Sequence, residues 1–520
     1  MEQKAAWYPA RTALRCAVGP ILLGWQGCDA MPLSNHGDPM LRGRQGTAGF
    51  GAPRQTAYAL VGVATLVAAA LGVVAVDRPV APFALLAGAV LLATLCLVRI
   101  DVFFALAIFG YAVVPEWLAA RGPVGPSVSV HMLIVLAAFA QGLRFYLAPN
   151  RRTADSLARV RWVDIALLVY AATVVFSVRD GTISGRLAAL MPAVEPVVLY
   201  YLARFCWTRR LSTAPIAWAA VASAAALSLS ILAEAALGRV IFVRDATTYS
   251  WAGTASDSLR PAGFLGGAPL SGTVLVLLLC VLPIAWATFG HWGRVIVALV
   301  ACLSALATVA TLTRSPILGL VVLLGIIILA RFGWVAVAAA AVLAPLAYVS
   351  IRALLAQGGR FAAAMTRSGT VEWRTVFREV ALNKLAAADS SSLLFGAGFD
   401  SARVYVSGVS YGFANSFLTV AVAYGAIGLA GLIATLVAVS LSGLSYLRGR
   451  AEARAIGVTL LSLVACLVIG AATRDITNWA PVMGVFLLLA GIFIDPTRFG
   501  SREEYGVGFP SSDPSMVTTD

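Results

Sequence analysis

Residues 391–432, SSLLFGAGFDSARVYVSGVSYGFANSFLTVAVAYGAIGLAGL, interrupt a long series of apolar segments with a glycine turn, an aromatic-rich polar loop and then Asn415. Because polar backbone cannot lie exposed in hydrocarbon, this interruption predicts a polar site at a membrane surface. Two arginine-bearing elements, RPAGFLGG from Arg260 and TLTRSP around Arg314, lie beside other apolar segments. The chain topology can bring all three elements to one side of a membrane.

The composition is that of a polytopic membrane protein. Hydrophobic residues make up 60% of the chain and charged residues 12%, and the mean hydropathy is +0.88, far from the balance of a soluble domain. Runs of about 17 to 25 apolar residues are each long enough to cross the hydrocarbon as a helix. We therefore expect an all-α fold, an integral membrane bundle of about fourteen transmembrane helices with a partly helical outer loop.

The predicted spans are 56–76, 79–98, 101–119, 129–147, 162–178, 186–206, 212–237, 270–290, 293–312, 315–331, 333–352, 414–447, 455–472 and 478–495. The run 414–447 is too long for one perpendicular span, and we count it once. Its glycines Gly425, Gly428 and Gly431 predict a tilt, a kink or close packing against a neighbouring helix.

The spans divide the chain into three parts. Residues 1–55 are predicted to be a disordered cytoplasmic extension, because their one apolar patch is too short and interrupted to span. Residues 56–496 form the predicted transmembrane domain, which includes the outer loop 353–413. Residues 497–520, rich in Ser, Gly, Asp and Pro, form a predicted disordered cytoplasmic tail.

The arginines predict the orientation, because short cytoplasmic loops are enriched in Arg and Lys. Counting from a cytoplasmic N-terminus places most loop arginines inside, among them Arg99, Arg144, Arg161, Arg204 and Arg294. We therefore expect a multi-pass protein of the cytoplasmic (inner) membrane with both termini in the cytoplasm. The same count places 238–269, 353–413 and Arg314 on the outer side.

The net charge of +14 comes almost entirely from arginine. Anionic headgroups of membrane lipids account for most of the inner arginines as partners, and no nucleic-acid-binding motif accompanies the charge, so nucleic acid is excluded. His36, His131 and His291 are too scattered for metal-ligand spacing, and the acidic residues form no carboxylate cluster. We expect no metal site and no cofactor.

The outer loop 353–413 is long for a connector and is predicted to be folded. The pattern VEWRTVFREVALNKLAA from Val371 brings Trp373, Val376, Phe377 and Val380 onto one side of a helix, with Arg374 and Arg378 as neighbours. We expect this helix to lie along the membrane with its apolar face below and its basic face above. It is either a plug that covers the bundle or part of an anion site.

Six short elements follow one another in the region 186–436. They are R-x-x-G-F at Arg260–Phe264, T-x-x-R-S at Thr311–Ser315, R-x-x-F at Arg374–Phe377, L-x-G-x-G-x at Leu394–Phe399, N-S-x-L at Asn415–Leu418 and G-x-x-G-L at Gly425–Leu429. In this order and on one predicted side, they resemble the O-antigen ligase and polymerase superfamily of lipid-linked glycan transferases.

The resemblance implies a glycosyltransferase that moves a growing saccharide from an undecaprenyl pyrophosphate carrier to an acceptor on the outer face of the membrane. It also implies a polysaccharide chain-length regulator as a partner. Loss of a lipid pyrophosphate builds negative charge, which a divalent metal or fixed cations must neutralise. With no metal site predicted, we assign this role to Arg260, Arg314 and Arg374, whose forked donors suit phosphate oxygens. Arg378 and Asn415 are further candidates for substrate binding.

One position departs from the family pattern. Ligases of this family have a histidine directly before the asparagine of the N-x-x-L element, whereas this chain has Ala414, and 353–413 contains no histidine. The pattern therefore resembles a polymerase of exopolysaccharide or O-antigen repeat units better than a ligase. The general base would then be a substrate group or a carboxylate, with Asp400 and Glu372 as candidates. Either carboxylate could equally be an ion-pair partner.

Glu195 lies near the middle of the predicted span 186–206, between Pro192 and Pro196, which predict a broken or kinked helix. A charge at this depth is expected to face the bundle interior or a cavity. Three interpretations remain open: a structural carboxyl, a residue that lines the acceptor path, or a proton carrier in a transporter.

Two other classes of protein compete with the transferase. A bundle with kinked helices and a buried acid could export a lipid-linked saccharide, although no internal repeat is evident between the two halves. A structural scaffold of the cell envelope is the other alternative, and it leaves the outer arginines unexplained.

Overall fold

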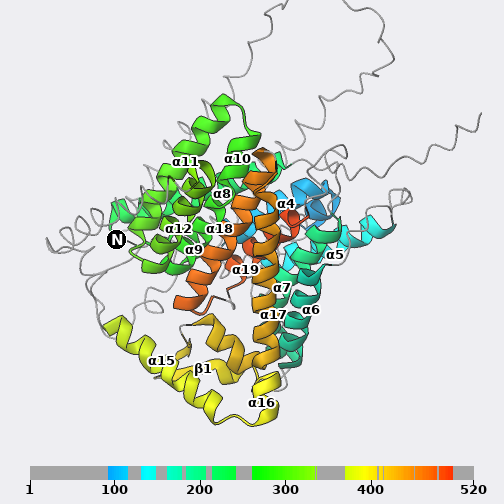
Figure 1. The fold of residues 1–520 in the computed structure, drawn as a ribbon, viewed down its shortest axis with the longest axis vertical. Helices are drawn as coiled ribbons and strands as arrows, with labels where there is room; N and C mark the ends of the chain where they lie inside the picture. Colours follow the sequence, from blue (N-terminus) through cyan, green and yellow to red (C-terminus); the bar gives the residue numbers. More distant parts are fainter. Residues whose placement is uncertain are drawn as a thin grey trace, which may run out of the picture. The chain divides into compact units, whose positions relative to one another are not determined.

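The computed structural model describes residues 92–114, 130–147, 161–177, 183–206, 213–239, 241, 261–333, 335, 369–406, 409–413, 415–449, 451–476 and 479–495. These residues form a bundle of α-helices together with one short β-hairpin (Figure 1). The predicted termini 1–55 and 497–520 lie outside the described residues.

The α-helices are α4 Ile100–Val113, α5 Val130–Leu147, α6 Trp162–Ser177, α7 Ile183–Cys206, α8 Ala214–Leu237, α9 Ala268–Leu279, α10 Leu282–Thr288, α11 His291–Ala310, α12 Arg314–Phe332, α15 Gly369–Ala386, α16 Ser390–Phe395, α17 Ser416–Tyr446, α18 Ala451–Thr473 and α19 Ala480–Phe493. Two 3-10 helices are η3 Gly263–Leu265 and η4 Phe399–Ala402. Strands β1 Arg403–Val406 and β2 Val409–Gly412 pair antiparallel, with Arg403 opposite Gly412.

The hairpin is the one departure from the predicted all-α class within the described residues. Its strands occupy the aromatic-rich polar loop, where RVYV and VSYG flank Ser407 and Gly408. Valine and tyrosine favour extended backbone, and a Ser-Gly pair suits a tight turn. The prediction for this loop was based on its polarity, and no strand was predicted there.

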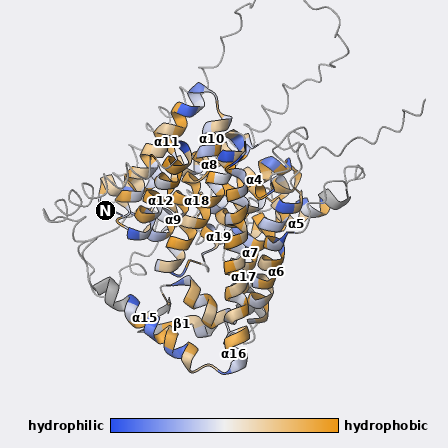
Figure 2. Cartoon of the chain, in the orientation of Figure 1, coloured by the Kyte–Doolittle hydropathy of each residue, from blue (hydrophilic) through white to orange (hydrophobic). Residues whose placement is uncertain are grey.

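Six stretches of the described helices are long and apolar enough to cross a membrane: Ala214–Leu237, Ala268–Thr288, His291–Ala310, Arg314–Phe332, Ser416–Tyr446 and Ala451–Thr473. Figure 2 shows hydrophobic residues predominating along these helices and a mixed pattern on α15. The chain is thus a multi-pass membrane protein. The predicted span 56–76 and most of 79–98 and 333–352 lie outside the described residues, and each of the other predicted spans coincides with helix.

Pro192 and Pro196 do not break α7, whereas the sequence predicted a broken or kinked helix; a kink stays a prediction. The helix continues from Ile183 to Cys206 through both Pro192 and Pro196. Membrane helices tolerate proline where neighbouring helices and local adjustments satisfy the freed backbone groups. By contrast, the predicted span 270–290 is divided between α9 and α10, and Pro283 stands in the first turn of α10, where its missing N–H costs nothing.

A buried ion-pair cluster joins α6, α7 and the end of α19. The Arg204 guanidinium, fully buried, lies 3.4 Å from Asp164 and 3.0 Å from Asp495. Arg161 reaches Asp495 at 3.3 Å, and the Tyr200 hydroxyl donates to Asp164 at 2.7 Å. Arg204 is therefore an internal structural residue, although loop arginines were expected to face the cytoplasm. Charges in hydrocarbon persist when they are paired in this way.

Gly425 breaks α17 into residues 416–424 and 426–446, as its φ of 71° and ψ of −173° are not helical. The glycine turn 396–398 packs against this break, where Ala397 N–H donates to Val422 O at 2.9 Å and Gly398 N–H to Ala423 O at 3.2 Å. A Cβ atom at Gly425 would overlap the backbone of Leu394. The predicted kink is confirmed, and glycine is required there by both conformation and space.

We expect Gly425→Ala to destabilise the protein, because a positive φ costs an L-residue about 1–2 kcal/mol and the added methyl group displaces the 394–396 backbone. The measurement is the midpoint of thermal unfolding in detergent. Gly325→Ala is the matched control, since nothing lies within 4 Å of a Cβ atom at Gly325. Equal melting temperatures for the two variants would contradict this account of the break.

Candidate functional site

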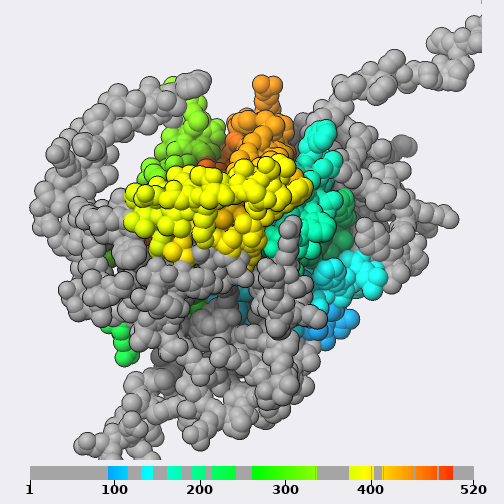
Figure 3. Space-filling view, turned by 90° about the horizontal axis from the view of Figure 1, so that it is seen from below, coloured from blue at the N-terminus to red at the C-terminus, as the bar shows by residue number. Residues whose placement is uncertain are grey.

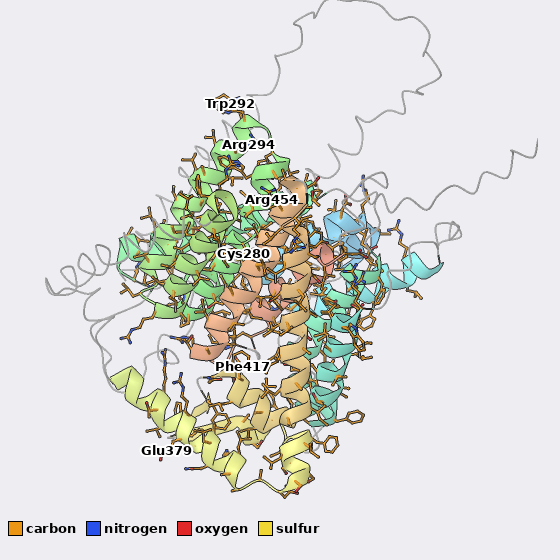
Figure 4. All side chains as sticks on the ribbon, viewed as in Figure 1. Cys280, Trp292, Arg294, Glu379, Phe417 and Arg454 are labelled. Atoms are coloured by element: carbon orange, nitrogen blue, oxygen red, sulfur yellow. The ribbon has the colours of Figure 1, made fainter. Side chains whose placement is uncertain are left out.

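Helix α15 lies across one end of the bundle, here called the α15 end (Figure 1). Figure 3 views the molecule from this side and shows the yellow segment, which contains α15 and α16, extending between the green and the teal helices. The opposite end carries Trp292 and Arg294 at the start of α11 (Figure 4). The sequence prediction that the loop 353–413 is partly helical is confirmed for its described residues.

The face of α15 that packs on the bundle differs from the predicted one. Phe377 is 3% exposed and Ala381 is fully buried, whereas Val376 is 49% exposed. Residues 374, 377, 378 and 381 share one helical face, on which Phe377 is buried, Arg374 is half-buried and Arg378 is exposed but reaches the bundle through its guanidinium. The inward face is thus rotated by one residue, about 100°, from the predicted apolar stripe. The basic residues face the bundle instead of pointing away from it.

Arg378 and Asn415 converge on a single carbonyl group near the end of α18. The Arg378 Nη2 and the Asn415 Nδ2 atoms each donate to Ala472 O at 3.2 Å. The last carbonyls of a helix have no partner within it, so these side chains satisfy one of them. Arg378 therefore brings the positive charge of α15 to the end of α18, where the helix dipole is negative.

Asn415 also caps the first part of α17. Its Oδ1 accepts the Leu418 N–H at 3.1 Å, as is usual for an N-cap asparagine. The next residue, Ser416, donates its N–H and its hydroxyl to Arg474 O at 3.0 and 2.9 Å. The N-S-x-L element thus fastens the start of α17 to the end of α18, and a contact of Asn415 with substrate remains a prediction.

Arg314 is the first residue of α12 and follows a strained turn. Leu312 has a φ of 50°, and no other non-glycine residue in the described ranges has a positive φ. The turn is held by the hydroxyl of Thr311, which donates to Thr308 O at 2.7 Å, and that of Thr313, which donates to Thr311 O at 3.1 Å. Such backbone strain is concentrated at functional sites, where surrounding contacts maintain it. The half-buried Arg314 is thereby held at a fixed position.

The packing of α12 on α18 places Arg314 at the level of Ala472. The Cys466 Sγ atom contacts Gly319 O at 3.4 Å, which sets the register of the two helices. Arg314 lies five residues before Gly319, and Ala472 lies six residues after Cys466. Since α18 runs toward the α15 end and α12 away from it, both positions lie about 7 to 9 Å farther toward that end.

Three consecutive residues of α9, Ser271 to Thr273, form a platform that contacts the other elements of the site. The Ser271 hydroxyl donates to Ala262 O in the RPAGF element. Gly272 leaves room for Pro316, since a Cβ atom there would lie 2.8 Å from its ring. The Thr273 methyl group lies 3.8 Å from the position of a Cβ atom at Gly470 in α18. The platform therefore links the Arg260 loop, the Arg314 turn and the end of α18.

Glu234, near the end of α8, binds backbone groups on either side of the segment 242–260, which lies outside the described residues. It is 1% exposed, and its carboxylate accepts N–H groups from Ile241 at 2.8 Å, Ala262 at 2.7 Å and Gly263 at 2.8 Å. Arg260 itself lies outside the described residues, two positions before this anchor. Sequence reasoning missed Glu234, although a single acid in an apolar run, ILAEAAL, is itself a signal of an internal role.

The other predicted site residues make no described contact with the arginines or Asn415. Glu372 lies in α15 and Asp400 in η4, but their side chains, like Ala414, lie outside the description. Glu195 is 5% exposed, as expected for an inward-facing charge, and accepts the Tyr111 hydroxyl at 3.3 Å. Tyr111 in turn stacks on His131, with ring centroids 4.5 Å apart. These contacts join Glu195 to α4 and α5.

Asp389 caps α16 beside the site. Hydrogen bonds from the hydroxyl of Ser391 and then from Ser392 lower the pKa of Asp389 from 3.8 to about 2. Because its pKa is lowered in the folded protein, the carboxylate stabilises the cap fully above pH 3.8 and loses this effect as the pH falls through about 2. The cap therefore does not titrate near neutral pH.

Within the described residues, no three His, Cys, Asp or Glu side chains are grouped so that they could hold a metal ion. The described charged groups at the α15 end include Arg314 on α12 and Arg374 and Arg378 on α15, together with Lys384 and the acids Glu379 and Asp389. The forked donors of guanidinium groups suit a phosphate or pyrophosphate ligand. The arrangement can bind an anion and neutralise charge that develops on it.

No protein-family model matches this chain, and a search of curated proteins gives no match. Fold and site define the class: a multi-pass membrane protein with inward-facing arginines at one end of its bundle.

Glu234→Gln should loosen the anchored loop, because an amide replaces one carboxylate oxygen with a donor that opposes the backbone N–H groups. We expect hydrogen exchange at residues 262 and 263 to accelerate by about tenfold, the equivalent of one lost hydrogen bond of roughly 1.4 kcal/mol. Mass spectrometry of the peptide that contains residues 261–267 gives the rate. Exchange in α11 serves as the internal control, and an unchanged rate at 262 and 263 would contradict the anchoring role.

Proposed function

We propose that the chain is a membrane glycosyltransferase that polymerises undecaprenyl-pyrophosphate-linked oligosaccharide repeat units. The observation that carries the proposal is the inward basic face of α15, with Arg378 on the end of α18 and Arg314 at the same level. In this proposal the α15 end is the outer face of the cytoplasmic membrane, both termini are cytoplasmic, and the chain crosses about fourteen times.

The proposed reaction needs fixed positive charge at the leaving group. The acceptor hydroxyl oxygen forms a bond to the anomeric carbon, the bond from that carbon to the pyrophosphate oxygen breaks, and the electron pair stays on the leaving lipid pyrophosphate. Arg314, Arg374 and Arg260 neutralise this charge without a metal ion. The hydroxyl proton passes to a carboxylate, Asp400 or Glu372, or to the departing phosphate. Arg378 and Asn415 hold the end of α18 beneath the bound substrate.

Two alternatives use features of the same chain. Ligase-type transfer of a preformed glycan to a lipid or protein acceptor would use the same arginines, and Ala414 argues against its imidazole-dependent form. Export of a lipid-linked saccharide is supported by the buried Glu195, Tyr111 and His131 cluster, which resembles a proton-carrying group. A chain-length regulator is the proposed protein partner of the polymerase.

The deciding experiment supplies purified protein in liposomes with an undecaprenyl-pyrophosphate-linked repeat unit. We expect a ladder of glycans that grows by one repeat unit per step, in the presence of a chelator and without a second acceptor. Gel electrophoresis of the released glycan measures it. A single transfer to another acceptor would support the ligase, and movement of intact substrate across the bilayer without extension would support the exporter.

Arg314→Ala should lower the rate of extension by about 100-fold or more, the usual effect of removing one group that stabilises a developing anion. Arg314→Lys should recover little, since an ammonium ion lacks the forked donors of a guanidinium. Rates are compared at equal amounts of folded protein.

The matched control is Arg294→Ala, which removes an exposed arginine at the opposite end of the bundle, where it donates to Trp286 O. It should extend glycans at the wild-type rate. Near-normal extension by Arg314→Ala would reassign Arg314 to contact with lipid headgroups.

A further inference from the structure

A groove of about 490 Å³ runs between α17 and α18. Its lining includes Phe417, Leu436, Val437, Leu441, Val464 and Val468. Ser440 also lines the groove, but its hydroxyl donates to Leu436 O at 2.9 Å. The groove therefore offers an apolar surface with no unsatisfied polar side chain among its lining residues.

The groove is open at its side and closed at its floor. Leu436 and Val464 are 6% and 7% exposed and form the floor, whereas Val437 is 51% exposed and Leu441 is 61% exposed at the rim. Both helices that form it are long and apolar enough to span a membrane. The open side thus faces hydrocarbon, and an apolar chain can enter it from the membrane.

The groove leads directly to the arginine site. Val464, Val468 and Ala472 are spaced four residues apart and form one ridge along α18. The ridge ends at the Ala472 carbonyl, to which Arg378 and Asn415 donate. Phe417 lies two residues after Asn415 and near the α15 end (Figure 4). The groove thus ends about one helical turn before the carbonyl to which Arg378 donates.

We propose that this groove binds the polyprenyl chain of a lipid whose pyrophosphate is held by the arginines at the α15 end. The inference rests on the proposed function and names the part of the protein that recognises the carrier lipid. An anionic head with a single long apolar chain matches a single apolar groove with cations at one end, whereas a phospholipid brings two chains. The arginines Arg314, Arg374 and Arg378 give the complementary charge.

The groove can be tested without any catalytic turnover. Purified protein is exposed to undecaprenyl diphosphate that carries a photoreactive group on its chain, and labelled peptides are mapped by mass spectrometry. We expect the label on residues 433–441 and 464–468, and competition by unlabelled undecaprenyl diphosphate. Val437→Trp fills the groove and should lower this labelling by about tenfold, the equivalent of 1.4 kcal/mol of binding free energy.

The matched control is Leu324→Trp, a similar enlargement at an exposed apolar position on α12 outside the groove. It should leave the labelling unchanged. Equal labelling of the same peptides by a photoreactive phospholipid, or undiminished labelling of Val437→Trp, would overturn the proposal in favour of ordinary contact with bulk lipid.

A kinetic measurement separates this proposal from the proposed function. With repeat units carried on undecaprenyl or on farnesyl diphosphate, Val437→Trp should raise the KM for the long-chain donor about tenfold relative to the short-chain donor. An equal change for both donors would reject the groove while leaving polymerisation intact. Specific labelling of the groove in a protein that makes no ladder would uphold lipid recognition and reject the polymerase.

Discussion

The structure depends on one constraint: hydrocarbon provides no water to hydrogen-bond the ends of helices, so each end within the bundle needs a donor or acceptor from the protein. At the end of α18 this need is met by residues distant in sequence, Arg378 and Asn415 at Ala472 O and Ser416 at Arg474 O. The same bonds that complete the helix therefore determine where α15 and α17 lie. Arg378 is therefore positioned by the hydrogen bond that it donates at the end of α18.

The rest of the α15 end follows the same rule. Glu234 accepts the backbone N–H groups of Ile241, Ala262 and Gly263, and Ser271 supplies a donor to Ala262 O. Gly425 permits a break in α17, and the 396–398 turn gives the interrupted backbone its partners. These described segments are thus each bonded to a regular helix.

Sequence reasoning found what depends on local pattern. Apolar runs located the described helices to within a few residues, and Gly425 indicated the break. The inward face of α15 could not be predicted from the sequence, because Phe377 belongs to both possible apolar faces of the helix. Only the burial of Ala381 and the contact of Arg378 with the end of α18 show which face lies inward. The Ser271–Thr273 platform carries no pattern at all, since its role arises from neighbours on three separate segments. Arg204 was interpreted as a loop charge because its partner Asp495 lies at the far end of the chain.

The long sequence separation between Arg204 and Asp495 affects how the protein is assembled during synthesis. Asp495 follows Arg204 by 291 positions in the sequence. Until α19 is in place, Arg161, Asp164 and Arg204 carry one more positive charge than negative charge, which is unfavourable in a buried site. Insertion of the last helix neutralises a charge that α7 introduced much earlier. A chain that stops short of residue 495 therefore retains this imbalance, and its α6 and α7 lack the carboxylate that completes their ion pairs.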